Sequence, residues 1–469
     1  MEIKFFFSIG GALLLLLAFT GCMKAPGPFD TPEEIAQTFS REKHPALLPA
    51  ERVLTLKKAL KTALLNNPTN LAAAQAVLAA KYGYFRALSA YAPEIDLTAS
   101  PQHNLTRGWE LKNPPVGVMR RNDNFVSSTT IQATWLLFDG FARELETIIA
   151  KQEYNKSRAA EKNVIRLLER AVAYAYYDMY LAGEEMVIYE EDLAFQQSAL
   201  SQAEIRFRNG HVSKASVLNF KILAARAKSR ISNARFRRQT AFHALCALMG
   251  CDRQELTEYV PLEKISADIL PFIHDDIFYL ELALSNRPDL LMEKIALNVA
   301  FRRKQQTLAN FLPQFRFFSE FGFNTYNARY GGYQVSRAHS RQGAFAYGIE
   351  GTWNIFRGFD SFNELRSRAA LEKAAFWGLN KKFLDIVADV RDAASNCRNS
   401  QYQIQLFQDM AQWVREQRDL VYSEYLNGRE TVTRLNEAQD TLIEAQSKLL
   451  ISTVEFNKAA AQLAAAVGK

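Results

Sequence analysis

Residues 63–68, Ala-Leu-Leu-Asn-Asn-Pro, return in the second half of the chain as residues 283–288, Ala-Leu-Ser-Asn-Arg-Pro. Three further pairs follow in the same order: Tyr-Ala-Pro at 91–93 and Phe-Leu-Pro at 311–313, Trp-Leu-Leu-Phe-Asp-Gly at 135–140 and Trp-Asn-Ile-Phe-Arg-Gly at 353–358, and Arg-Asn-Gly at 208–210 and Leu-Asn-Gly at 426–428. The spacings between the pairs also agree, apart from one loop in each half. The chain is therefore predicted to contain one structural unit twice.

The hydrophobic period changes in the same order in each half. A helix of about 25 residues is followed by a strand, a loop, a second strand, a very long helix, an Asn-Gly turn and a last helix. The strands alternate large apolar residues with small or polar ones, most clearly over residues 345–355. Such alternation over about ten residues, rich in aromatic side chains, is typical of a sandwich or a transmembrane barrel.

The long helices run for roughly 68 residues without proline, which corresponds to a rod of about 100 Å. After each Asn-Gly turn, mostly apolar residues recur at 3-4 spacing, from Val217 to Leu248 and from Leu435 to Ala466. Arg238 is the main exception to this seam. The pattern predicts that each long helix folds back on the next helix as an antiparallel coiled coil.

Four strands cannot close a membrane barrel, which needs about eight or more. An open sheet in lipid would leave backbone N–H and C=O groups unpaired at its edges, so several copies must share one barrel. A polar strand face favours the wider barrel of three copies over the side-chain-filled barrel of two. That face contains Asp96, Thr98, Gln132, Arg316, Glu320 and Glu350.

Taken together, the repeated openings, the proline before each first strand, the strand-to-helix turns and the Asn-Gly turns resemble the TolC-like outer-membrane efflux proteins over about residues 50–467. The resemblance implies an α+β membrane protein with a twofold internal repeat and a long antiparallel α-helical coiled-coil barrel. It also implies a homotrimer, in which four β-strands per chain contribute to a transmembrane β-barrel of about twelve strands.

The same resemblance implies partners and a function. The chain would be the channel-tunnel of a tripartite efflux system and would conduct drugs or other small molecules passively from the periplasm to the exterior. Its partners would be a periplasmic adaptor (membrane fusion) protein and an inner-membrane pump of the resistance-nodulation-division type. Two alternatives remain at this point: an outer-membrane component of type I protein secretion, and a coiled-coil structural lipoprotein without a pore. The aromatic strand faces argue against the second alternative, because a spacer does not need them.

The N-terminus predicts export. An apolar run over residues 5–19 is too short to span a bilayer and reads as a signal peptide. Gly21-Cys22 follows it and resembles a lipoprotein processing site, so Cys22 is expected to carry the lipid, including palmitate, in the outer membrane. Cleavage of an ordinary signal peptide elsewhere is the alternative. The expected division is a signal peptide (1–21), a lipidated segment (22–54), a first repeat (55–250), a connecting segment (251–274) and a second repeat (275–469).

Composition and spacing argue against other classes of function. With 48% hydrophobic and 23% charged residues, most of the chain is not disordered. The basic residues at 226–238 have almost no aromatic neighbours, so no nucleic-acid partner is expected. The histidines and cysteines do not reach metal-ligand spacing, and no nucleophile or phosphate-binding loop is recognisable. We therefore expect no metal, no cofactor and no enzymatic activity.

Two groups of residues are candidate functional sites. The helix turns Gly210-His211 and Gly428-Arg429 are expected to contact the adaptor, and the resemblance places a periplasmic gate just beyond them. The gate candidates are Ser216, Asn219, Arg434 and Glu437. The family often has an aspartate where this chain has Ser216 and Arg434, so an Arg434–Glu437 pair could replace an acidic ring. A solvated helix flank without a gating role is the alternative.

The second group lies on the strands. A period of two fixes which residues share a face, so one assignment determines all the others. One face is expected to contact outer-membrane lipid and contains Ile131, Trp135, Phe345, Tyr347, Ile349 and Trp353. The other is expected to line the lumen and contains Thr130, Gln132, Glu350 and Thr352.

Overall fold

The computed structural model describes residues 53–112, 116–251, 262–265, 275–331 and 336–468. Cys22, the predicted signal peptide and the predicted lipidated segment up to residue 52 lie outside the described residues, as does most of the predicted connecting segment. The same order of helices and strands occurs twice, as the repeat predicts, and among the described residues the second half adds one short 3-10 helix. The first half contains α3 (Leu56–Asn66), α4 (Pro68–Ser89), β1 (Glu94–Lys112), β2 (Val116–Phe138), α5 (Ala142–Arg208) and α6 (Lys214–Met249). The second contains α7 (Asp276–Asn286), α8 (Pro288–Gln306), the 3-10 helix η1 (Thr307–Phe311), β3 (Gln314–Gly331), β4 (Ser336–Thr352), α9 (Asp360–Leu426) and α10 (Val432–Ala466).

The strands form one antiparallel sheet in the order β1-β2-β3-β4, so β1 and β4 are its two edges. They contain 17 to 23 residues, about twice the length of the segments over which the sequence alternates. The additional residues lie toward the β1–β2 and β3–β4 hairpin ends. Among the described side chains there, polar residues are common on both faces, as at Gln102, His103, Ser340 and Arg341. Alternation between apolar and polar residues reveals only the part of a strand that has an apolar face, so it does not show the full length of the strand.

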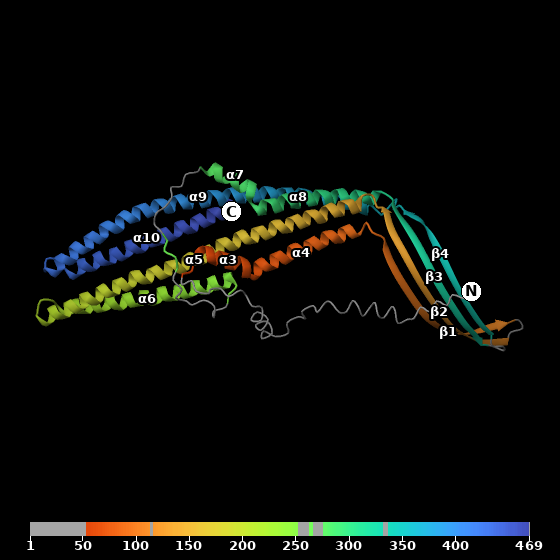
Figure 1. Ribbon diagram of the computed structural model, residues 1–469, viewed down its shortest axis with the longest axis horizontal. Helices are drawn as coiled ribbons and strands as arrows, with labels where there is room; N and C mark the ends of the chain where they lie inside the picture. The colour runs from red at the N-terminus through yellow and green to blue at the C-terminus, as the bar shows by residue number, and fades with distance from the viewer. Residues whose placement is uncertain (1–52, 113–115, 252–261, 266–274, 332–335, 469) are drawn as a thin grey trace.

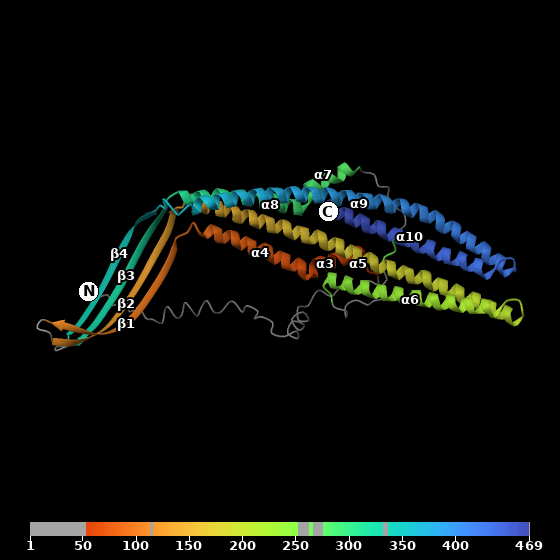
Figure 2. The same cartoon turned by 180° about the vertical axis from the view of Figure 1, so that it is seen from behind.

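The molecule is elongated, with the sheet at one end and the helices extending away from it (Figure 1). Both α5 and α9 contain 67 residues, close to the predicted length, and each folds back onto the next helix as a long hairpin. Near the sheet the helices pack side by side in the order α4, α5, α8, α9, and farther away in the order α6, α5, α10, α9 (Figure 2). Within the described residues, no helix is apolar over a length sufficient to span a bilayer.

The predicted heptad seam forms the interior of each hairpin. Leu435, Leu442 and Leu463 of α10 are buried, as is Phe220 of α6. Arg238, the exception in the seam, is only half-buried, and its guanidinium lies over Gly183 of α5. A Cβ at Gly183 would lie 3.8 Å from that guanidinium, which is an ordinary van der Waals contact, so the arginine packs closely over this turn of α5.

A joint closes the first repeat where its last helix returns to its first two helices. The Asn67 side-chain amide donates to the Leu248 carbonyl oxygen over 2.8 Å, and its side-chain oxygen caps α4. Gly250 ends α6 with a φ of 65°, and a Cβ there would lie 2.5 Å from the carbonyl oxygen of Asn66. Glycine avoids both the left-handed strain and this overlap. We call Asn66, Asn67, Leu248 and Gly250 together the first joint.

The second joint occupies the equivalent place with different chemistry. Arg287 stands where the first joint has Asn67 and donates to the Ala466 carbonyl oxygen over 3.4 Å. Its guanidinium also binds Asp289 through two contacts of 2.7 and 3.0 Å, and Asp389 at 3.1 Å. Gly468 follows α10 with a φ of 86°, packed against Asn286 as Gly250 is against Asn66.

Asp289 connects three helices through this second joint. Lys382 of α9 lies 2.9 Å from its carboxylate, and Arg166 of α5 lies 3.7 Å away. Burial alone would raise the pKa of Asp289, but hydrogen bonds from Arg287 and Lys382 outweigh it and hold the pKa well below its usual range. The carboxylate therefore remains ionised inside the helical wall.

Candidate functional site

The strand register confirms that the sheet has one apolar and one polar face. Cross-strand partners share a face, and one row of partners contains Leu97, Ile131, Phe321 and Phe345. The next rows on that face include Trp135, Phe317, Ile349 and Tyr347. These side chains are mostly exposed in the single chain, Tyr347 to 70%. An apolar face this continuous requires an apolar environment.

The opposite face is polar. Asp96, Gln132 and Glu320 are successive partners in one row, and Arg316 pairs with Glu350 in another. Thr130 and Thr352, also predicted for the lumen, lie on this same face. The register thus separates the two predicted sets of strand residues onto opposite faces. Which face contacts lipid stays a prediction.

Trp353 differs from its predicted place, because it lies one residue beyond the end of β4. The ladder between β3 and β4 ends at Gln314 and Thr352, since Pro313 has no N–H to extend it. Trp353 instead donates its indole N–H to the carbonyl oxygen of Phe311 over 3.2 Å. Its counterpart Trp135 lies inside β2 and donates to the Tyr91 carbonyl oxygen over 3.0 Å.

Each strand-to-helix turn contains two consecutive residues in the left-handed region. Gly140 and Phe141 have φ of 71° and 69°, and the second repeat has the same pair at Gly358 and Phe359. A left-handed phenylalanine is strained, yet both repeats have one. Each of these aromatic rings packs edge-on against the phenylalanine three residues earlier. The sequence pattern marked both turns but not this backbone conformation.

The two helix turns at the far ends of the hairpins are built alike. Gly210 and Gly428 have positive φ, 76° and 73°, and end their helices. Ser213 caps α6 by accepting from the Ser216 N–H, and Thr431 caps α10 by accepting from the Arg434 N–H. His211 lies between Gly210 and Ser213, Arg429 lies between Gly428 and Thr431, and both residues are exposed. Both turns therefore present exposed polar residues at the end farthest from the sheet.

The gate candidates do not all come together in one chain. Ser216 and Asn219 are half-buried on α6, whereas Arg434 and Glu437 lie on α10 of the other hairpin. Arg434 and Glu437 do form an ion pair of 3.4 Å, but it links successive turns of the same helix. Both side chains are about half exposed or more, 49% and 61%. This pair therefore does not connect the two hairpins within a chain.

Other residues connect the two hairpins, and the sequence did not point to them. Arg206 of α5 donates to the Tyr425 carbonyl oxygen over 3.1 Å, and its guanidinium lies 5.3 Å from the centre of the Tyr425 ring. Gln202 donates to the Tyr422 hydroxyl over 3.2 Å. Arg206 and Tyr425 stand a few residues before the predicted turns. The sequence pattern therefore predicts that both residues lie near the ends of the hairpins. It does not predict that they contact each other, because a contact between the two repeats leaves no periodic pattern in the sequence.

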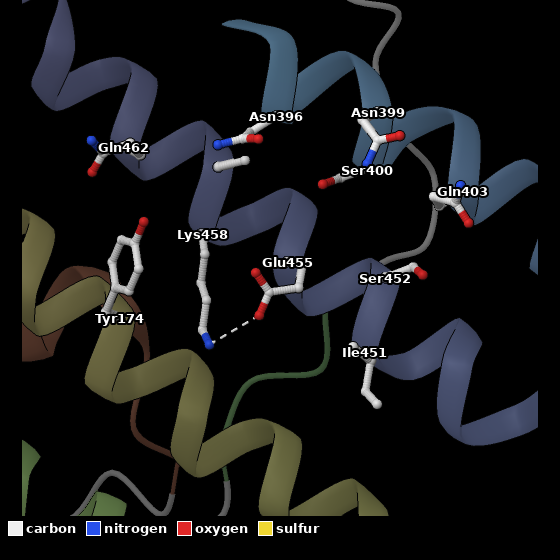
Figure 3. A pocket seen from close by; sticks show the side chains of 11 residues that line it. Tyr174, Asn396, Asn399, Ser400, Gln403, Ile451, Ser452, Glu455, Lys458 and Gln462 are labelled. Carbon is white, nitrogen blue, oxygen red and sulfur yellow. Dashed lines mark hydrogen bonds and ion pairs between the residues drawn. The ribbon is translucent and has the colours of Figure 1, made fainter. Parts of the chain in front are cut away.

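A polar cavity of about 350 Å³ lies in the helical wall between α5, α9 and α10 (Figure 3). Tyr174 and Gln462 line it, and Lys458 and Glu455 meet at its edge. Lys458 Nζ lies 2.6 Å from Asp178 and 3.3 Å from Glu455. Burial would lower the pKa of Lys458, but hydrogen bonding to Asp178 and Glu455 raises it overall. The cation of this cavity is therefore already matched by carboxylates.

Nothing in the described residues points to metal chemistry. In those segments no group of three or more histidine, cysteine, aspartate or glutamate side chains could hold a metal ion. The thiol of Cys251 donates to the Cys246 carbonyl oxygen over 3.6 Å, and Cys246 and Cys397 are buried. Burial raises the pKa of Cys397 to about 11, so this thiol stays protonated and unreactive at neutral pH.

Comparisons with known proteins agree with this geometry. The family model described as outer membrane efflux protein matches residues 59–251 and 279–469. The fold is similar to the CmeC outer membrane channel of Campylobacter jejuni, with a TM-score of 0.74 and 15% identity, covering 88% of this chain and 85% of that one. It is also similar to the outer membrane protein VceC of Vibrio cholerae, with a TM-score of 0.72 and 17% identity, covering 88% and 96%. The comparison with curated protein sequences found no match.

Proposed function

This chain belongs to the outer membrane efflux protein family and is an outer-membrane efflux channel, and we propose that three copies close one continuous pore. In this assembly the four-stranded sheets would join into a barrel of about twelve strands, and the helical hairpins would join into a tunnel below it. Small molecules would pass through passively from the periplasm to the exterior.

The open edges of the sheet are the observation that carries this proposal. Strand order leaves β1 and β4 with one unpaired side each, and the apolar face of the sheet requires a membrane around it. In hydrocarbon, unpaired backbone groups cost several kcal/mol each, roughly, so the edges must pair. Pairing β4 of one copy with β1 of the next satisfies every copy in the same way.

The helices have matching open edges. No residue of α4 is buried, and Leu71, Leu78 and Phe85 form an exposed heptad row along it. At the other edge, α9 exposes Trp413 and Leu420, again seven residues apart. Rows at heptad spacing are typical of helix-on-helix packing. Contacts of α9 with α4 and α6 of a neighbouring copy would bury both edges.

Partners and gating follow as further parts of the proposal. The exposed turns at Gly210-His211 and Gly428-Arg429 would meet a periplasmic adaptor that connects the tunnel to an inner-membrane pump. Closure of the tunnel would involve Ser216, Asn219, Arg434 and Glu437, which would approach their counterparts when three copies converge. Contacts of Arg434 and Glu437, within or between chains, would then hold the resting tunnel shut.

Cys22 would add a second attachment to the outer membrane. Acylation at Cys22 and a closed barrel would anchor the chain redundantly, so a Cys22→Ser protein should lose the lipid label yet still insert. Mass spectrometry of the mature protein tests this directly. An unmodified Cys22 in the mature chain would refute the lipoprotein assignment and leave the pore proposal intact.

The pore itself is tested by the face assignment. A lysine at Ile349 would face lipid near the apolar row and should cost about 2–4 kcal/mol, whereas a lysine at Thr352 would face water in the lumen. We expect Ile349→Lys to abolish the three-copy species in native mass spectrometry and the conductance in planar bilayers. Thr352→Lys should retain both. Loss of assembly in both variants, or a wild-type chain that stays monomeric and does not conduct, would contradict the proposal.

A further inference from the structure

Beyond the apolar rows of the sheet, toward the hairpin ends, positive side chains gather on one face. Side chains alternate between faces along a strand, and the β1–β2 and β3–β4 registers continue without a shift. The face of each residue therefore follows from its neighbours. Farther along, on the face of the apolar rows, lie five exposed residues of β1 and β4 that we call the cationic belt: His103, Arg107, Arg337, His339 and Arg341. Leu105, which is also exposed, lies between His103 and Arg107 on this face.

The opposite face at the same level carries no charge among the described side chains of β1 and β4. The residues there are Gln102, Asn104, Thr106, Ala338, Ser340 and Gln342. Strands that merely extended into water would carry charge on either face, because both faces would be hydrated equally. A positive charge confined to the outward face indicates a negatively charged neighbour on that side.

The belt keeps a net positive charge after its own contacts are counted. Asp123 of β2 lies on the same face, and His103 Nε2 approaches it to 2.6 Å. His339 bonds to the side-chain oxygen of Asn327. Among the described outward side chains at this level, three arginines thus stand against one aspartate, which a histidine already contacts.

We propose that the cationic belt binds the phosphate groups of an anionic glycolipid in the outer leaflet of the outer membrane. Arginine suits this role because its planar guanidinium binds phosphate through two hydrogen bonds at once. The apolar row that ends with Phe345 lies two rows below Arg341, with Phe323 in the row between, and these apolar side chains would contact the acyl chains of the same lipid. Lipid chains and lipid phosphates would thus meet apolar and cationic residues in the order in which a bilayer presents them.

The extent of the belt favours a glycolipid over a simple phospholipid. Arg337 and Arg341 are four residues apart, which is about 13 Å along a strand. A simple phospholipid headgroup offers one phosphate, whereas a phosphorylated disaccharide offers two phosphates that are separated by the length of the sugar. Closure of the pore, on which this part rests, would also place β4 of one copy beside β1 of the next. His103 and Arg107 would then join the three residues of β4 at each boundary between copies.

The test measures glycolipid binding by the assembled protein. The probes are diphosphoryl lipid A, its phosphate-free form and phosphatidylglycerol, each titrated into detergent-solubilised protein and followed by native mass spectrometry. The belt variant combines Arg107→Gln, Arg337→Gln and Arg341→Gln. The control variant removes the same charge from exposed helix positions through Lys228→Gln, Arg235→Gln and Lys381→Gln.

We expect the belt variant to bind diphosphoryl lipid A on the order of 100-fold more weakly, because each surface arginine contributes roughly a factor of five to anionic-lipid binding. The control variant should bind diphosphoryl lipid A as tightly as the wild type does. The phosphate-free lipid should bind weakly to the wild type and to both variants. Equal affinity of the wild type for lipid A and phosphatidylglycerol, or unchanged binding by the belt variant, would overturn the inference. Conductance of the same samples is measured in planar bilayers. A wild type that does not conduct would contradict the pore proposal, whereas a conducting wild type with unchanged lipid binding by the belt variant would contradict only the belt.

Discussion

Both joints fix the end of the last helix of their repeat, but the first joint uses a neutral amide and the second uses charged groups. In the first joint, the neutral amide of Asn67 both caps α4 and ties down the end of α6. In the second joint, Arg287 ties down the end of α10 but cannot accept a hydrogen bond, so Asp289 accepts from the Leu290 N–H instead. Asp289 stands where the first repeat has Thr69. A change at one position of the joint is thus matched by a change two residues later.

The difference shows that a repeat conserves backbone geometry more strictly than side-chain chemistry. A glycine follows α6 and another follows α10, because the left-handed backbone and close contacts at these two places admit little else. The capping residue was free to change, provided that each buried polar group kept a partner. An uncharged joint and an ionic joint should therefore fail differently when disturbed.

The largest effect is expected from Asp289→Asn. The substitution leaves Arg287 and Arg166 buried near each other with much less compensating charge, and breaking a buried ion network costs about 3–5 kcal/mol. Chemical unfolding followed by circular dichroism measures the loss. The equivalent change in the first repeat, Thr69→Ala, should cost at most about 0.5 kcal/mol. Similar costs at both positions would show that the ionic joint is not held by its charges.

The pH dependence of the ionic joint sharpens the same contrast. The pKa of Asp289 is depressed in the folded state, so its contribution is fully present above the unfolded carboxyl pKa of about 3.9. The contribution is lost as the pH falls from there through the folded pKa. The stability difference between wild type and Asp289→Asn should be constant from about pH 7 to 5 and shrink below about pH 4. A difference that already declines near neutral pH would argue against Asp289 as the titrating group.

The glycines should respond alike in both joints. Alanine at Gly250 or Gly468 would adopt a left-handed backbone, costing about 1–2 kcal/mol, and would also overlap Asn66 or Asn286. Gly210→Ala is the matched control, because its φ is similarly positive but open space surrounds it. Unfolding free energies should therefore fall further for both joint variants than for Gly210→Ala. Equal losses at all three glycines would show that the left-handed backbone alone causes the destabilisation and that the overlap with Asn66 or Asn286 adds nothing.

The ends of the hairpins offer another unequal pair of positions. Arg206 reaches from the first hairpin to Tyr425 of the second, while its counterpart Glu424 is exposed. Arg206→Ala should remove about 1–2 kcal/mol of contact between the hairpins and raise the resting conductance in planar bilayers. Glu424→Ala should leave conductance near the wild-type level. An unchanged Arg206→Ala channel would show that this contact does not restrain the hairpins.

The smallest effect is expected at Arg434 and Glu437. Exposed ion pairs contribute about 0.2–1 kcal/mol, so Glu437→Lys should raise resting conductance only a few-fold. Adding Arg434→Glu in the same chain should restore the lower conductance by reinstating opposite charges. If Glu437→Lys conducts no more than wild type, the electrostatic part of the gate proposal is wrong.

The fold was predictable because its determinants are periodic along the chain. Heptad spacing from Leu435 to Ala466 and the alternation around Ile349 each indicate one face of one element, and the repeat supplies each signal twice. The joints were not predictable, because Asn67 and Leu248, or Arg287 and Asp389, are far apart in sequence and meet only after folding. The same is true of Arg206 and Tyr425. A period marks what faces inward, but it does not reveal which buried polar group meets which.

The open edges of the sheet have a genetic consequence. Because β1 and β4 differ in sequence, each copy in a closed ring would present one edge to the copy before it and the other edge to the copy after it. One copy with a blocked β4 edge would then interrupt the whole ring, whatever its neighbours are. If such a copy were expressed in equal amount with the normal one, random mixing in threes would leave only about one eighth of the rings free of it. Damage to a single strand edge would behave as a dominant trait in a cell that still carries an intact copy of the gene.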